Sequence, residues 1–321
     1  MGEPPEVTLG ELADLYREAL PQQSDSDTRY RVSHRLADIE MQGAEEDLTE
    51  GENAADFAAA ITAYEELLRE NGTHETTDRI LYQLSKAYDL DGQPDRSHAL
   101  LKELAERTPD SPYLPEAYFR RAERSFVEAD YENAETLYTQ VVDYGNATPY
   151  FTRALYMQGW SRFKRERLNG AVAAFTGSLD QLLSAETDIA TLPRGEQELV
   201  QDSLRILAII FDKQGGTSAI ASAYDALGER PYEYMLYDAL GTLYLAQERY
   251  SDSAETFHAF TREHPDSRKA HHFAERVIDA YTAGGFTEQI VTAKADYVAH
   301  FGVQGDYWQA SDTAAREVMA N

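Results

Sequence analysis

Small residues recur along this chain at a fixed interval of 37 positions. The interval joins Ala60, Ser97, Ala134 and Ala171 in turn. Apolar residues follow each of them at the three- and four-residue steps of an amphipathic helix. A residue that faces a neighbouring helix at close range must be small, so the interval marks one helix–helix contact per repeat. A fixed period of this length, with one helix pair per step, is typical of a solenoid.

The segment Pro115 to Val142 shows the repeat most clearly. Two stretches with helical spacing flank a short turn at Ala129, Asp130 and Tyr131. Apolar or small residues line one face of each stretch: Tyr118, Ala122, Ser125 and Phe126 before the turn, and Ala134, Leu137, Tyr138 and Val141 after it. We predict an all-α fold, a right-handed superhelical solenoid of about seven antiparallel helix pairs.

The helical pattern divides the chain into five segments. They are an N-terminal helix with a linker (residues 1–27), four repeats (28–183), a long connection (184–197), three further repeats (198–303) and a terminal helix (304–321). The opening helix is predicted over Glu3 to Leu20, where Thr8 and Glu11 have the spacing of a capping box. The long connection is the expected hinge. The terminal helix, Asp306 to Ala320, is expected to be either a cap or half of an eighth repeat.

The first repeat is longer than the others. Ala37 and Ala60 lie 23 residues apart, whereas the equivalent Ala122 and Ala134 lie 12 apart. The extra residues amount to about three helical turns. The acidic segment Gly43 to Glu52 is therefore expected either to lengthen the helix or to form a protruding loop.

The chain is strongly acidic, with 57 Asp and Glu against 29 Lys and Arg and a formal net charge of −28. This charge repels nucleic acid and anionic membranes, and it favours a basic partner or simply solubility. The absence of cysteine excludes disulfides and thiolate chemistry. No apolar run is long enough to span a membrane, and the first residues lack the pattern of a signal peptide. We expect either a cytoplasmic protein or a piece of a longer one.

No motif in the sequence indicates catalysis. The chain has no phosphate-binding glycine loop, no dinucleotide fingerprint and no nucleophile elbow. The one histidine cluster, His258, His264, His271 and His272 with Glu275 nearby, occupies ordinary repeat positions. We therefore predict a protein that is not an enzyme and that needs no cofactor or metal; a metal-dependent enzyme is the weakest alternative.

Several positions resemble the tetratricopeptide repeat. That family has a small residue early in its first helix, a tyrosine three residues later, an Asp-Tyr turn, a small residue and an aromatic in its second helix, and a closing proline. The matching residues here are Gly241, Tyr244, Tyr250, Ser253, Phe257 and Pro265, together with Asp130, Tyr131, Ala134 and Tyr138. The resemblance extends over residues 28–300 and implies a scaffold that binds other proteins.

Two joints between repeats carry a narrower resemblance. Residues Thr108 to Tyr113 and His264 to Ala270 are similar to the joints of bacterial envelope tetratricopeptide proteins, such as the Tol–Pal coordinator and the lipoprotein of the outer-membrane barrel assembly machine. The resemblance implies a periplasmic or cell-envelope scaffold. The chain departs from those proteins in having no signal peptide, lipobox cysteine or preceding coiled coil. A cytoplasmic adaptor or a self-associating structural segment is the alternative.

The same interval of 37 also governs a set of candidate binding residues. In the repeat family, first-helix residues just after the packing position face a concave groove. The residues at such positions are Tyr82, Lys86, Phe119, Glu123, Tyr156, Trp160 and Phe163. We predict that they line a groove for a protein or peptide ligand, and the net charge favours a basic one. The alternative is that these aromatic residues only pack between repeats.

Overall fold

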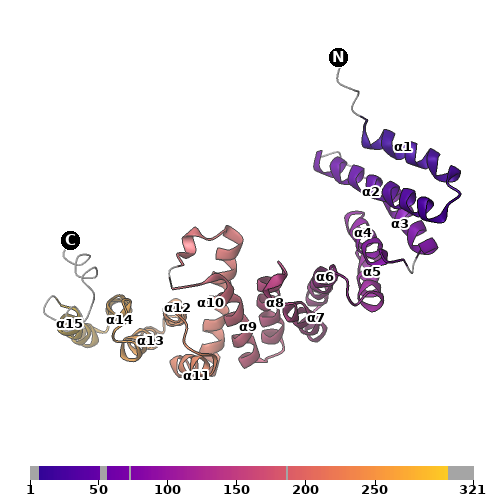
Figure 1. The fold of residues 1–321 in the computed structure, drawn as a ribbon. Helices are drawn as coiled ribbons and strands as arrows, with labels where there is room; N and C mark the ends of the chain where they lie inside the picture. Colours follow the sequence, from indigo (N-terminus) through magenta and orange to yellow (C-terminus); the bar gives the residue numbers. More distant parts are fainter. Residues whose placement is uncertain (1–6, 51–55, 72–73, 186, 303–321) are drawn as a thin grey trace, which may run out of the picture. The chain divides into compact units, whose positions relative to one another are not determined.

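The structure is a computed structural model, and it describes residues 7–50, 56–71, 74–185 and 187–302. Over these ranges it has fifteen α-helices and no β-strand, as the sequence predicts (Figure 1). The chain divides into two compact units, residues 1–154 and 155–321. The boundary falls inside helix α8, whereas the sequence places the expected hinge at 184–197. That connection lies within the second unit, and its role as a hinge stays a prediction.

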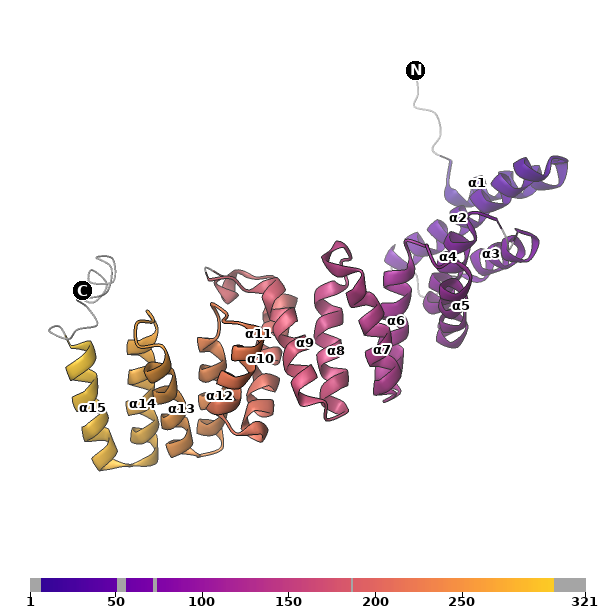
Figure 2. The same cartoon turned by 60° about the horizontal axis from the view of Figure 1, so that its bottom comes forward.

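Within its described residues the first unit contains seven complete α-helices. They are α1 (Leu9–Ala19), α2 (Ser26–Glu50), α3 (Ala58–Asn71), α4 (Thr77–Leu90), α5 (Pro94–Arg107), α6 (Leu114–Val127) and α7 (Tyr131–Asp143), after which α8 (Phe151–Lys164) begins. Helix α1 packs along α2, and α4 with α5 and α6 with α7 form adjacent pairs (Figure 2).

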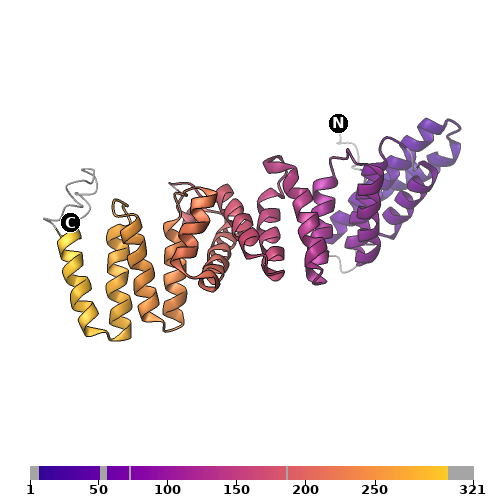
Figure 3. The same ribbon diagram turned by 90° about the horizontal axis from the view of Figure 1, so that it is seen from below.

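The second unit continues in the same way. Its helices after α8 are α9 (Leu168–Leu182), α10 (Arg194–Gln214), α11 (Thr217–Leu227), α12 (Tyr234–Ala246), α13 (Tyr250–Glu263), α14 (Ala270–Gly284) and α15 (Thr287–Phe301). Figure 3 shows α12, α13, α14 and α15 side by side, with the chain direction alternating from one helix to the next.

The start of the chain confirms one local prediction and corrects another. The Thr8 hydroxyl accepts a hydrogen bond from the Glu11 amide (3.2 Å), and the Glu11 carboxylate accepts one from the Thr8 amide (3.0 Å), so the predicted capping box is present. Because Thr8 has an extended backbone, the helix begins at Leu9 and not at Glu3. In the first repeat the extra residues lengthen α2, which runs to Glu50.

The turns inside the helix pairs repeat one backbone device. Gly92, Ala129 and Glu166 all have positive φ, at 75°, 62° and 59°, and they lie 37 residues apart. At Ala129 the following amide, that of Asp130, donates to the Ser125 carbonyl (2.9 Å), and the Ala129 amide donates to Phe126 (3.0 Å). These two bonds define a Schellman helix end. Glu248 and Gly285, again 37 apart, repeat the conformation in the second unit.

The small positions lie at the helix–helix contacts, as predicted. Ala60, Ala134 and Ala171 are fully buried, and Ser97 is buried as well. Gly241 in α12 shows why a small residue is needed, because a Cβ atom there would overlap the ring of Phe257 in α13. The period therefore records the places where two helices touch most closely.

The predicted connection at residues 184–197 is shorter than expected. Helix α10 already begins at Arg194, directly after Pro193, so the irregular part ends earlier. Proline favours this place because its missing N–H lies among the amides that a helix start leaves unpaired. A short 3-10 turn, Ile189–Thr191, lies in the connection.

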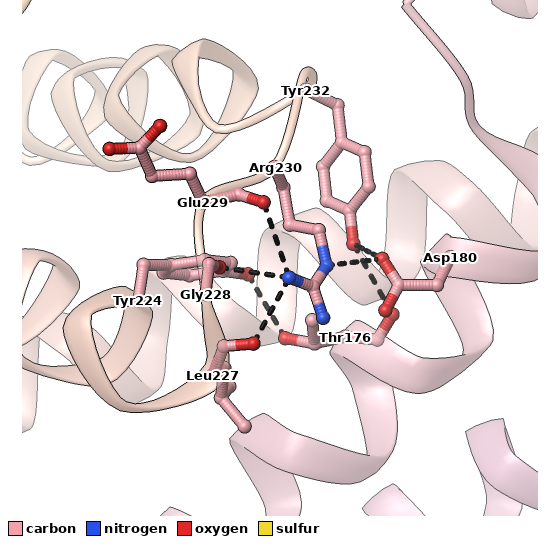
Figure 4. A network of polar contacts seen from close by, with 8 residues as sticks. All are labelled: Thr176, Asp180, Tyr224, Leu227, Gly228, Glu229, Arg230 and Tyr232. Atoms are coloured by element: carbon pink, nitrogen blue, oxygen red, sulfur yellow. Dashed lines mark hydrogen bonds and ion pairs between the residues drawn. The ribbon is translucent and has the colours of Figure 1, made fainter.

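A polar network fastens the loop between α11 and α12 to α9 (Figure 4). Arg230 Nε donates to Asp180 Oδ1 (2.8 Å), while its Nη1 donates to the carbonyls of Leu227 and Gly228 (3.1 and 2.9 Å). The Tyr232 hydroxyl, which is buried, donates to the same Asp180 oxygen at 2.5 Å. One carboxylate thus holds two loop residues in place.

Two further expectations from the sequence concern the C-terminal segment and membrane-spanning helices. The predicted helix Asp306 to Ala320 lies outside the described residues. None of the described helices combines the length and the apolar character that crossing a bilayer requires.

Candidate protein-binding surfaces

Tyr82 and Lys86 lie on α4 in the first unit. Tyr82 is partly buried: its ring stacks on Tyr113 at 4.4 Å between centroids, and its hydroxyl donates to Glu116 Oε2 (2.9 Å). Burial, reinforced by that hydrogen bond to Glu116, raises its pKa above the ordinary value. Lys86 forms an ion pair with Glu45 of α2 (2.6 Å), and 43% of its side chain stays exposed.

Phe119, the aromatic predicted to lie in the middle of the groove, is 3% exposed. Its ring contacts Tyr138 and Tyr150, at centroid distances of 5.7 and 5.2 Å, and the Arg153 guanidinium lies 5.3 Å above it. The interpretation of Phe119 as a groove-lining side chain does not fit this burial. A phenyl ring has no polar atom that would keep it at the surface, so it belongs to the core between repeats.

Glu123, one turn further along α6, does reach the surface. Its side chain is 43% exposed and pairs with Arg153 at 3.4 Å. Partial burial raises the pKa of Glu123, and the charges of Arg153 and Arg120 oppose that rise. Glu123 and Lys86 therefore occupy equivalent positions with opposite charge, and both are ion-paired and partly exposed.

Three more predicted residues lie together on α8, in the second unit. Tyr156, Trp160 and Phe163 are all partly buried, and the Trp160 ring meets the Phe163 ring edge-on at 5.7 Å. The Tyr156 hydroxyl and Trp160 Nε1 both donate to Asp202 Oδ2 of α10, at 2.6 and 3.3 Å. Burial and the bond to Asp202 raise the pKa of Tyr156 to about 12.

The sequence analysis missed two exposed apolar residues in the first unit. Leu90 ends α4 and is 39% exposed, and Val127 ends α6 and is 85% exposed. They lie 37 residues apart, so the period that marked the buried contacts could also have identified them. Each lies one helical turn after a predicted site residue, Lys86 or Glu123, and therefore shares a face with it.

Contacts between α4 and α6 show that these two faces are neighbours. Arg120 of α6 forms an ion pair with Asp89 and donates to Ser85 Oγ (3.4 Å), both on α4. Asp89 precedes Leu90, and Arg120 lies two turns before Val127 on the same helical face. The exposed ends of α4 and α6 therefore form one surface, which we call the Leu90–Val127 surface.

The histidines of the second unit are held in ordinary pairs. His264 lies 3.9 Å from Glu233, and His272 lies 3.8 Å from Glu275. Burial lowers the pKa of His271. Over the described residues no group of three or more His, Asp or Glu side chains is arranged to hold a metal ion.

The architecture is that of an all-α repeat protein, an array of helix pairs with a period of 37 residues. Within it, residues 239–273 match the tetratricopeptide repeat family model. This match covers most of α12, all of α13 and the start of α14, so the chain contains a tetratricopeptide repeat. No curated protein matches the chain.

Solved structures of repeat proteins resemble the chain only distantly. The C-terminal part of a TPR repeat-containing protein from Cytophaga hutchinsonii is 11% identical, covering 89% of this chain and 94% of that one with a TM-score of 0.43. A tetratricopeptide repeat protein from Parabacteroides merdae is 12% identical, with 88% and 97% covered and a TM-score of 0.39. A MamA protein is 16% identical, with 70% and 94% covered and a TM-score of 0.37. Because these scores lie below 0.5, the assignment rests on the family match and the repeat itself.

Proposed function

We propose that the chain is a non-catalytic scaffold that binds another protein, and that its first unit receives a basic segment on the Leu90–Val127 surface. The observation that carries this proposal is the exposure of Val127, at 85%, next to the equivalent Leu90. Exposed apolar side chains that recur on neighbouring helices offer contact area to a partner. Lys86 and Glu123 of the predicted groove lie one helical turn before Leu90 and Val127 on the same helices.

Charge favours a basic partner for this unit. Residues 1–154 contain 33 Asp and Glu against 14 Lys and Arg, a net charge of −19. Around the surface, Asp95 and Glu128 pair with Arg124, and Asp89 pairs with Arg120. The attraction therefore comes from the net charge of the unit and not from these three carboxylates. The field of the unit attracts a basic segment from a distance, and apolar contact holds it after docking. Added salt should therefore slow association more than it speeds release.

The test uses a defined peptide and paired variants. A fluorescent amphipathic peptide of alternating lysines and leucines serves as the probe, and its glutamate counterpart is the comparison. The double variant Leu90→Ser with Val127→Ser should weaken binding of the lysine peptide by about tenfold or more, as loss of apolar anchors does. Leu15→Ser is the matched control, because Leu15 of α1 is also exposed (57%) but lies on another helix. Equal binding by all variants would refute the surface.

We also propose that the protein works in the bacterial cell envelope. What supports this is the similarity of the joints at Thr108 to Tyr113 and His264 to Ala270 to those of envelope repeat proteins. Fractionation of the source cells, with detection by antibody, tests it. Recovery with periplasmic or envelope markers is expected, and recovery with cytoplasmic markers would favour the adaptor alternative.

Self-association is a second candidate function, and one observation favours it. Val291 and Val298 lie two turns apart on α15 and are 65% and 68% exposed. An apolar face of this kind suits contact with a second copy. Sedimentation should then depend on concentration, and the double variant Val291→Ser with Val298→Ser should abolish that dependence. If the protein sedimented as a monomer at every concentration, self-association would be refuted and the proposal of a scaffold for another protein would remain.

A further inference from the structure

Two lysines and two aromatic rings form a row in the second unit. The Lys164 ammonium lies 5.8 Å from the centre of the Trp160 ring, that ring meets Phe163 at 5.7 Å, and Phe163 carries the Lys213 ammonium at 5.6 Å. Three of the residues come from α8, and Lys213 comes from the end of α10. We call these four residues the lysine–aromatic row. It presents a cation at each end and aromatic surface between them.

Both lysines are exposed, and neither has a carboxylate at ion-pair distance among the described residues. The arginines of the unit differ, since Arg230, Arg249 and Arg276 pair with aspartates. Lys269 resembles the two lysines of the row, because it lies over the Tyr234 ring at 5.2 Å. In a chain with 57 acidic residues, two lysines held over rings without an acid keep their charge available.

The segment that carries Phe163 and Lys164 is basic in sequence, although its arginines have partners of their own. Four of the six residues from Arg162 to Arg167 are basic, and Glu166 is the only acid among them. Asp202, which lies beside the Trp160 ring, accepts bonds from Tyr156 and Trp160 and also forms an ion pair with Arg205 (2.5 Å). Its negative charge is therefore already compensated, and it does not cancel the charge of the two lysines.

We propose that the lysine–aromatic row binds an acidic segment of a partner protein, with carboxylates on both sides of an apolar residue. The carboxylates pair with Lys164 and Lys213, and the apolar side chain covers the rings of Trp160 and Phe163. Charge complementarity indicates the kind of ligand. The two lysine ammonium groups favour carboxylates, and the aromatic rings between them favour an apolar side chain. The inference rests on the proposed function only in taking the chain as a protein-binding array. Its surface and the sign of its ligand are different.

The 37-residue period relates the row to the first unit. Lys164 occupies the position that Leu90 and Val127 occupy in the first unit, 37 residues further along. Trp160 likewise occupies the position of Lys86 and Glu123. The same two register positions thus offer apolar and charged side chains in the opposite order, and the sign of the ligand follows from Lys164 and Lys213 themselves.

The test uses a fluorescein-labelled peptide in which a leucine is flanked on each side by two glutamates. Its C-terminus is amidated, so that only side-chain carboxylates can act as ligands. The comparison peptide carries lysines in place of the glutamates. The double variant Lys164→Gln with Lys213→Gln should bind the acidic peptide at least about tenfold more weakly than the unchanged protein does. Added salt should weaken binding of this peptide to the unchanged protein. In a Trp308→Phe background, Trp160 is the only tryptophan, so its emission should change on binding.

A matched control removes the same charge elsewhere in the unit. Lys294 of α15 is exposed, and Lys294→Gln should leave affinity for the acidic peptide within about twofold, since a distant surface charge is largely screened. Equal losses in Lys294→Gln and in the double variant would overturn the proposal, as would unchanged Trp160 emission. If the lysine peptide binds the Leu90–Val127 surface and the acidic peptide binds nowhere, this inference alone fails. If neither peptide binds, the proposed function fails as well.

Discussion

The two units follow one period but use its exposed positions differently. At one register position the first unit has Phe119, which is 3% exposed, and the second has Tyr156, which stays partly exposed. The difference follows from the neighbours: Tyr138, Tyr150 and the Arg153 guanidinium lie against the Phe119 ring, whereas the Tyr156 hydroxyl donates to Asp202 at 2.6 Å. The repeat decides which side chain approaches a neighbouring helix. The side chains around it decide whether a ligand can reach it.

The units also differ in charge. The first carries a net charge of −19, and the second, with 24 acidic and 15 basic residues, carries −9. In the second unit Lys164 and Lys213 lie over aromatic rings, and no carboxylate among the described residues pairs with them. The net charge of the whole chain therefore does not describe the local charge of each unit.

The largest predicted effect tests the buried aromatic. Phe119→Ala should lower the free energy of unfolding by about 3–5 kcal/mol, because it removes a buried ring and leaves a cavity. At the equivalent position Tyr156→Phe should cost only about 1 kcal/mol, since one hydrogen bond is lost and the ring remains. Denaturant melts measure both. A mild effect at Phe119 would show that this ring lies at the surface and would restore it to the groove.

Much of the fold could be predicted because its causes are local. The capping box of Thr8 and Glu11 depends only on residues three apart in the sequence. The small residues at the 37-residue interval, Ala60 to Ala171, are needed wherever two helices approach closely. The start of α10 was placed too late because Pro193 and Gly195 look like a loop, although a proline directly before a helix often begins it. That choice depends on what the rest of α10 can bury, which a local pattern does not show.

The candidate site was less predictable. The interval found Phe119 but could not tell core from groove, because burial depends on Tyr150, which lies between the repeats. It could have found Leu90 and Val127, which share its register. The row that joins Phe163 to Lys213 depends on α10 reaching α8 across the long connection, and no sequence interval encodes that contact.

The second prediction asks whether both units depend on the small positions equally. Ala134→Leu and Ala171→Leu each insert a larger side chain at a fully buried helix contact. Each should cost about 1–3 kcal/mol through overpacking. The exposed Glu132→Ala should stay within about 0.5 kcal/mol. If urea melts ranked Glu132→Ala above either leucine variant, the shared register of the two units would be wrong.

The third prediction concerns a contact found only in the second unit. Asp180→Ala removes the acceptor shared by Arg230 and Tyr232, and it should cost about 1–2 kcal/mol. The figure stays modest because a quarter of each ionic side chain is exposed to water and salt. Hydrogen exchange should show faster opening of α11 and α12, while α4 and α6 of the first unit stay unchanged. Uniform loss of protection in both units would contradict a local role for this network.

The smallest effect tests the turns that the units share. Ala129 and Glu248 adopt positive φ, which costs a residue with a Cβ atom about 1 kcal/mol or slightly more. Glycine removes that cost but loses more entropy on folding, so Ala129→Gly and Glu248→Gly should each stabilise the fold by at most about 0.5–1 kcal/mol. Their counterparts Gly92 and Gly285 already have the favoured residue, and Gly92→Ala and Gly285→Ala should destabilise by a similar amount. In melts of the four variants, the substitution to glycine should raise the stability and the substitution to alanine should lower it, in each unit. Destabilisation by Ala129→Gly would mean that its turn lacks the left-handed conformation, and the common helix end of the two units would then be incorrect.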